Sequence, residues 1–195
     1  MRATPSVPAA IPRPRPFITA HRVVKVSAMA AASTPAIRTL TQAKVAHRVH
    51  AYPHDPRADS YGAEAVDALA AELGLDAAQI FKTLVLELAN GSLAVAVLPV
   101  PNTLSLKAAA AALGVAKASM ADKTKAERTT GYVLGGISPL GQRKLLPTVV
   151  DDSALTWDRV LCSAGKRGLE IEVAPADLIR LTSAVTATVR TGQSG

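Results

Sequence analysis

The segment that most restricts the fold is Gly135–Gln142, with the sequence Gly-Gly-Ile-Ser-Pro-Leu-Gly-Gln. Adjacent glycines allow backbone conformations with positive φ and let other groups approach the peptide N–H closely. Pro139 fixes its own φ and favours an extended Ser138, so the segment can continue neither a helix nor a central strand. The pattern predicts a sharply turned loop. It is either an ordinary tight turn or a loop that binds a carbonyl or phosphate through its backbone donors.

The net charge of +7 arises at the N-terminal end of the chain. Eight basic residues and no acidic residue precede Asp55, and the remainder of the chain is almost neutral. Residues 1–28 are also rich in proline and lack the continuous apolar stretch of a secretory signal. We expect them to form a disordered extension, with a transit peptide or a start at Met29 as alternatives. Residues 29–195 then form a single domain, and the high pI does not indicate binding to DNA.

The composition excludes several classes of protein. The single cysteine, Cys162, rules out an internal disulfide framework and indicates a reducing, cytoplasmic location. No apolar run approaches the ~18 residues needed to span a membrane, so we expect no membrane association. Aromatic residues make up 3% of the chain, and the core should therefore consist of small aliphatic side chains.

Hydrophobic periodicity and turn residues predict a series of short helices and strands. The expected helices are 34–43, 62–73, 105–113, 122–128 and 175–181. The expected strands are 45–52, 81–88, 93–98, 132–134, 148–150, 160–162 and 170–173. Asn90-Gly91 is a strong signal for a hairpin between the second and third of these strands. Short strands and helices without a regular βαβ order predict an α+β fold.

Lys82 is the first candidate for a functional side chain. It lies in the expected strand 81–88, where alternation places it on the same face as Leu84, Leu86 and Leu88. An ammonium group on an apolar face costs free energy unless it reaches solvent, a partner or a ligand. Either Lys82 extends to solvent from the strand end, or it has a functional role. The residues alone do not favour either of these two interpretations.

Other reactive residue types fit structural roles better. His47, His50 and His54 are not expected to bind a metal, because His47 and His50 point to opposite faces of their strand and no cysteine or carboxylate completes a ligand set. Cys162 lies in an apolar strand and is expected to be an unreactive core thiol. Trp157 is expected to pack in the core.

Six ordered segments of the chain carry a family resemblance. The most specific is Thr130–Gln142, TGYVLGGISPLGQ. The other five are Thr34–Ile37, His50–Asp55, Phe81–Leu84, Met120–Lys123 and Gly165–Glu170. Together they resemble the bacterial YbaK-like family of Cys-tRNA(Pro) deacylases, relatives of the editing domain of prolyl-tRNA synthetases. The resemblance implies a compact α+β domain with a mixed, curved sheet flanked by helices.

The resemblance also implies a site for the 3′-terminal aminoacyl-adenosine of a tRNA, with no cofactor or metal. Lys82 matches the catalytic lysine of the family. The matching substrate-binding positions are Tyr52, Gly135, Gly136, Ile137, Ser138, Pro139, Ser163 and Gly165. Lys166 and Arg167, which follow this last glycine, fit either contacts with tRNA phosphates or a solvated turn.

The implied activity is trans-editing, in which cysteine is released from mischarged Cys-tRNA(Pro) when its own thiol attacks the ester carbonyl. Lys82 would supply positive charge, and N–H groups of the glycine-rich loop would stabilise the oxyanion. The alternative is a non-catalytic module that binds tRNA or prolyl-tRNA synthetase. The presence of both Lys82 and the Gly135–Pro139 loop favours the enzyme. Aminoacyl-tRNA is the expected partner, and prolyl-tRNA synthetase is a candidate second partner.

Overall fold

The computed structural model describes residues 33–55 and 61–193, so the expected extension at residues 1–28 lies outside the described part of the chain. None of the helices in that part has the length and hydrophobicity of a membrane-spanning segment. The elements in chain order are α1 (Pro35–Gln42), β1 (His47–Ala51), α2 (Tyr61–Leu73), the short 3-10 helix η1 (Ala77–Gln79), β2 (Ile80–Leu88), β3 (Leu93–Pro99), β4 (Asn102–Leu104), α3 (Leu106–Ala112), β5 (Ala118–Met120), α4 (Lys123–Thr130), β6 (Thr148–Asp151), the 3-10 helix η2 (Asp152–Thr156), β7 (Val160–Lys166), β8 (Leu169–Val173), α5 (Pro175–Thr182), β9 (Val185–Ala187) and β10 (Arg190–Gln193).

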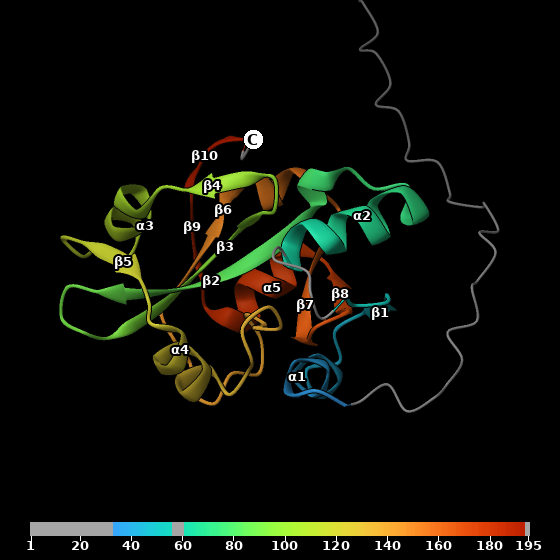
Figure 1. The fold of residues 1–195 in the computed structure, drawn as a ribbon, viewed down its shortest axis with the longest axis horizontal. Coiled ribbons are helices and arrows are strands. Elements are labelled where there is room, and N and C mark those ends of the chain that lie inside the picture. Colours follow the sequence, from blue (N-terminus) through green and yellow to red (C-terminus); the bar gives the residue numbers. More distant parts are fainter. Residues whose placement is uncertain (1–32, 56–60, 194–195) are drawn as a thin grey trace, which may run out of the picture. The chain divides into compact units, whose positions relative to one another are not determined.

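In this part of the chain, eight strands form one mixed sheet in the order β1-β8-β7-β2-β3-β6-β9, with β5 paired to β2. The β2–β3 hairpin is antiparallel, whereas β2 pairs with β7, and β3 with β6, in parallel. Figure 1 shows α2 and α3 on one side of β2 and α1, α4 and α5 on the other. A mixed sheet flanked by helices agrees with the expected α+β class.

Strand alternation divides the core between the two faces of the sheet. On one face, Phe81 and Val85 of β2 belong to the large cluster that includes residues of α1, α4 and α5. On the other face, Ile80 packs under α2, and Leu86 packs under α3 in a separate cluster. Lys82 lies on this second face, between the parts covered by the two helices.

Local sequence signals produce the expected helix ends and hairpin. The Thr34 hydroxyl accepts a hydrogen bond from the Ile37 N–H and caps α1, which has proline at its first position. The Asp122 carboxylate caps α4 in the same way. Gly91 adopts a φ of +78° in the turn of the β2–β3 hairpin, as the Asn-Gly signal predicted.

The strand expected at 132–134 was wrong, because this segment forms turns. Helix α4 ends at Gly131, whose φ is +80°, and this reversal directs Tyr132 into the core. The Tyr132 hydroxyl then donates a hydrogen bond of 2.8 Å to the Leu140 carbonyl. The sequence analysis also missed β4, β5, β9 and β10. Each has only three or four residues and depends on pairing with a segment distant in sequence.

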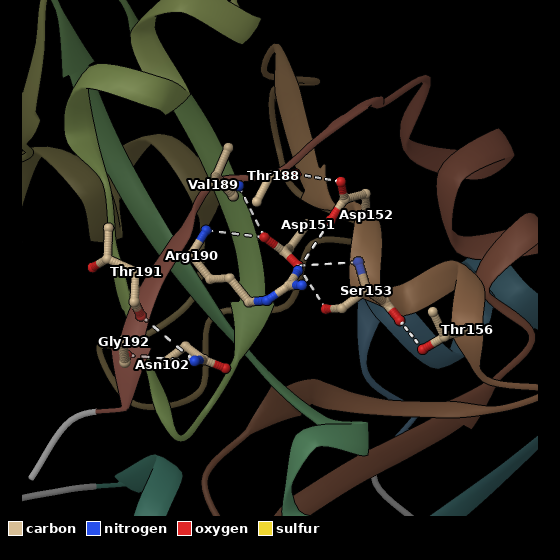
Figure 2. A network of polar contacts seen from close by, with 10 residues as sticks. All are labelled: Asn102, Asp151, Asp152, Ser153, Thr156, Thr188, Val189, Arg190, Thr191 and Gly192. Carbon is tan, nitrogen blue, oxygen red and sulfur yellow. Dashed lines mark hydrogen bonds and ion pairs between the residues drawn. The ribbon is translucent and has the colours of Figure 1, made fainter.

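A polar network joins the end of β6 to the last strand (Figure 2). The side chain of Asp151 is fully buried and accepts hydrogen bonds from the backbone N–H groups of Val189, at 2.9 Å, and Arg190, at 3.0 Å. It also accepts from Ser153 and pairs with the Arg190 guanidinium. Burial alone would raise the pKa of Asp151, but these hydrogen bonds outweigh it and hold the pKa below its ordinary value. The network thus fixes β10 to the main sheet.

Candidate active site

A cavity of about 640 Å³ lies beside the first half of β2. Its walls come from the first turns of α2, β2, the segment after β3, the glycine-rich loop, and the paired strands β7 and β8. It forms where β2 leaves β7, since the two strands pair only at Ile80 and Phe81. A volume in this range is typical of sites for small molecules or for one end of a larger ligand.

Lys82 lines this cavity. The pairing of β2 with β3 runs from Phe81 to Glu87 without a register shift, so alternation places Lys82 on the same face as Leu84 and Leu86, as predicted. Its ammonium group donates a hydrogen bond of 3.0 Å to the Val100 carbonyl, and no carboxylate in the described part of the chain pairs with it. Burial lowers the pKa of Lys82. The cavity thus holds a cation that lacks an anionic partner among the described residues.

Glu170 is a cavity residue that the sequence analysis missed. It lies on β8, opposite Ser163 of β7, and only 7% of its surface is exposed. Its Oε2 atom has no hydrogen-bond partner among the described residues. Burial raises the pKa of Glu170 to about 8, so the carboxyl is largely protonated at neutral pH. A cation beside it would favour the ionised form, which makes Glu170 a candidate ligand for an ammonium group.

Four of the predicted site residues, Lys82, Gly135, Ile137 and Ser163, come together around the cavity. The remaining five, Tyr52, Gly136, Ser138, Pro139 and Gly165, do not line it.

Two of these five residues make hydrogen bonds within the glycine-rich loop or to the segment just before it. Ser138 is buried, and its hydroxyl accepts a hydrogen bond from the Leu140 N–H. The Gly136 N–H donates to the Val133 carbonyl at 2.9 Å, so it is already used within the loop. The N–H groups of Gly135 and Ile137 have no recorded acceptor among the described residues, which leaves them as the available donors.

Tyr52 packs against the apolar cluster under α2, next to the cavity wall. Burial, and then the negative charges of Glu170 and Glu64, raise the pKa of its hydroxyl. The phenol therefore stays neutral. Thr83, which lines the cavity, adds a buried hydroxyl with no hydrogen-bond partner among the described residues.

The residues that were expected to be structural have structural contacts. His47 hydrogen-bonds the Val45 carbonyl, His50 bonds Glu172, and His54 bonds Glu64. Cys162 has no exposed surface, and burial raises the pKa of its thiol. Trp157 packs against the large core cluster.

Comparisons with known proteins agree with the observed fold. The model of a family described as "Aminoacyl-tRNA editing domain" matches residues 61–181. The chain is 37% identical over 158 residues to "Putative Cys-tRNA(Pro)/Cys-tRNA(Cys) deacylase EbsC" of Enterococcus faecalis, covering 81% of this chain and 93% of that protein. The crystal structure of "a putative trans-editing enzyme for prolyl tRNA synthetase" matches with a TM-score of 0.67 and 25% identity, over 80% of this chain and 93% of the other. That of "hypothetical protein APE2540" matches with a TM-score of 0.69 and 25% identity, over 80% and 99%.

Proposed function

The chain belongs to the YbaK-like aminoacyl-tRNA editing domain family, and on that premise we propose that it releases cysteine from mischarged Cys-tRNA(Pro) in trans. The observation that carries the proposal is a single cavity lined by an unpaired cation, Lys82, a buried carboxyl, Glu170, and the loop residues Gly135 and Ile137. These groups match an aminoacyl ester, which presents an ammonium group and a carbonyl that becomes an oxyanion.

Each group has a distinct role in this proposal. Glu170 ionises and binds the α-ammonium group of the substrate, which satisfies its free Oε2 atom. Lys82 places positive charge beside the ester oxygens or the terminal phosphate. The N–H groups of Gly135 and Ile137 stabilise the oxyanion, a role that Gly136 cannot fill while its N–H is donated to Val133.

The nucleophile is supplied by the substrate. The single cysteine of the protein is buried, and no general base is hydrogen-bonded to the cavity hydroxyls of Thr83 and Ser163 in the described part of the chain. The cysteine thiol therefore attacks its own carbonyl carbon, the C–O bond to the ribose breaks, and the ribose oxygen takes the thiol proton. The products are free tRNA and a thiolactone that water then hydrolyses. Holding thiol and carbonyl together supplies most of the rate increase.

A panel of charged tRNAs tests the proposal. Cys-tRNA(Pro) should be released faster than Ser-tRNA(Pro), because a hydroxyl is a weaker internal nucleophile than a thiol. Lys82→Ala should fold normally and lose about 100-fold or more in kcat/KM, while Lys107→Ala, which removes an exposed cation on α3, serves as the control. Equal rates on cysteine and serine would contradict thiol-assisted release and support an activated water. Tight tRNA binding without release would support the non-catalytic module instead.

A further inference from the structure

An anchored arginine lies just outside the cavity. Arg167 is in the turn between β7 and β8, and its guanidinium carbon lies 4.6 Å from the centre of the Tyr61 ring. Its Nε donates a hydrogen bond of 2.9 Å to the Leu134 carbonyl. Tyr61 and Leu134 both line the cavity, whereas Arg167 does not. The guanidinium is therefore held at the cavity rim by a stacking contact and a hydrogen bond.

The two adjacent glycines make this arrangement possible. Gly135 has a φ of +82°, and a Cβ atom there would lie 2.5 Å from the Tyr61 ring. A Cβ atom at Gly136 would lie 3.0 Å from the Arg167 backbone nitrogen and 3.1 Å from the Lys166 backbone. The loop, the start of α2 and the β7–β8 turn are thus packed too closely for side chains at either glycine, and this packing sets the position of Arg167.

Arg167 has no anionic partner in residues 33–55 and 61–193. None of the ion pairs recorded there includes it, and its two terminal nitrogens make no recorded hydrogen bond. A stacked guanidinium keeps its planar fork of donors free, and that fork matches two oxygens of a phosphate. A fixed arginine with free donors beside a cavity is arranged to receive an anion.

We infer that Arg167 forms a phosphate subsite that binds the phosphodiester on the 5′ side of the terminal adenosine. The inference rests on the proposed function, which places the aminoacyl group in the cavity with Lys82 and Glu170. The nucleotide chain must then leave through the cavity mouth, and its nearest anion is the phosphodiester one ribose away from the ester. Arg167 would recognise the nucleic-acid end of the substrate, independently of the amino acid.

Two minimal substrates test this inference. Cysteinyl-adenosine has the ester but no phosphate, and the cysteinyl trinucleotide CCA has both. For Arg167→Ala, the ratio of kcat/KM on the trinucleotide to kcat/KM on the nucleoside should fall about 10- to 100-fold from the wild-type ratio. Arg167→Lys should recover only part of the loss, because a lysine lacks the bidentate fork. Lys107→Ala removes the same charge from an exposed position of α3, which does not line the cavity, and should leave the ratio within about 2-fold of the wild type.

Two further readouts separate this inference from the proposed function. Binding of the uncharged trinucleotide, measured by fluorescence anisotropy, needs no turnover and should weaken in Arg167→Ala. The slope of log K against log salt concentration should become less negative by about 0.7 in Arg167→Ala, as expected for the loss of one phosphate contact on a single strand. An unchanged ratio and affinity, or an equal loss on both substrates with normal thermal unfolding, would overturn the phosphate subsite. A wild type that binds the trinucleotide through Arg167 but releases neither ester would leave the subsite standing and refute the deacylase.

Discussion

At Glu170, burial keeps the carboxyl protonated up to a pKa of about 8. In the unfolded chain the same group ionises near its ordinary pKa of 4.5. Between these two values the folded protein retains a proton that the unfolded chain releases, so the free energy of unfolding falls as the pH rises. Below the ordinary pKa this penalty disappears. The cavity thus retains a group that lowers stability at neutral pH.

Replacing Glu170 with glutamine should remove the pH-dependent penalty and also the ligand that we propose for the substrate ammonium group. Glu170→Gln should raise the free energy of unfolding relative to the wild type. This increase should be larger at pH 7.5 than at pH 5, by on the order of 3 kcal/mol. Urea unfolding at the two pH values measures this difference, and deacylation should fall in the same variant. An identical stability change at both pH values would show that the Glu170 carboxyl is not protonated in the folded protein.

Lys82 and Glu170 mark what the sequence could and could not reveal about the site. Lys82 interrupts an apolar face, and alternation alone exposes the conflict. Glu170 and Glu172 alternate with apolar residues in β8, which is the ordinary pattern of a strand with one solvated face. Only tertiary packing, with Ser163 opposite and α2 over the same face, shows that Glu170 is buried in the cavity wall.

At the scale of elements, the glycine-rich loop is a junction between α2 and the β7–β8 turn as well as a source of backbone donors. Positive φ at Gly135 and Gly131 could be expected from a glycine-rich sequence. The contact with the Tyr61 ring could not, because Tyr61 lies more than seventy residues earlier in the chain. For the same reason, the sequence predicted the helices, the hairpin and the longer strands but not the short strands β4, β5, β9 and β10.

A matched pair of glycine variants separates backbone strain from this close contact. Gly135 and Gly91 have similar φ values of +82° and +78°, but nothing lies within 4 Å of a Cβ atom at Gly91. Both Gly135→Ala and Gly91→Ala should lose about 1–2 kcal/mol of stability through left-handed strain. Only Gly135→Ala should also lose deacylation, by about 10-fold or more, because the loop and Tyr61 must separate. Equal activity in the two variants would show that the junction does not position the site.

For the whole molecule, the Asp151 network is the main polar link between the sheet and the C-terminal strand (Figure 2). Asp151→Ala should cost about 2–4 kcal/mol, since it removes the acceptor of two buried or partly buried N–H groups and leaves Arg190 paired with Asp152 alone. Asp177→Ala breaks the exposed pair with Arg180 and should cost less than about 1 kcal/mol. Urea unfolding compares the two.

Because the pKa of Asp151 is lowered, its contribution should be lost only in acid, as the pH falls below the ordinary carboxyl range. A loss for Asp151→Ala no larger than that for Asp177→Ala would contradict the role of the network.

The pairing of β1 with β8 has a consequence for synthesis on the ribosome. Among the described strands, β1 borders only β8, and its residues 47–51 pair with residues 169–173, which are translated more than a hundred residues later. At elongation rates of about 5–20 residues per second, that interval is roughly 6–25 s. During this time β1 has no strand partner among the described residues, so the first of the described strands to be made is among the last to join the sheet. The nascent chain must therefore hold an unpaired strand, and a slow, late step is expected in cotranslational folding.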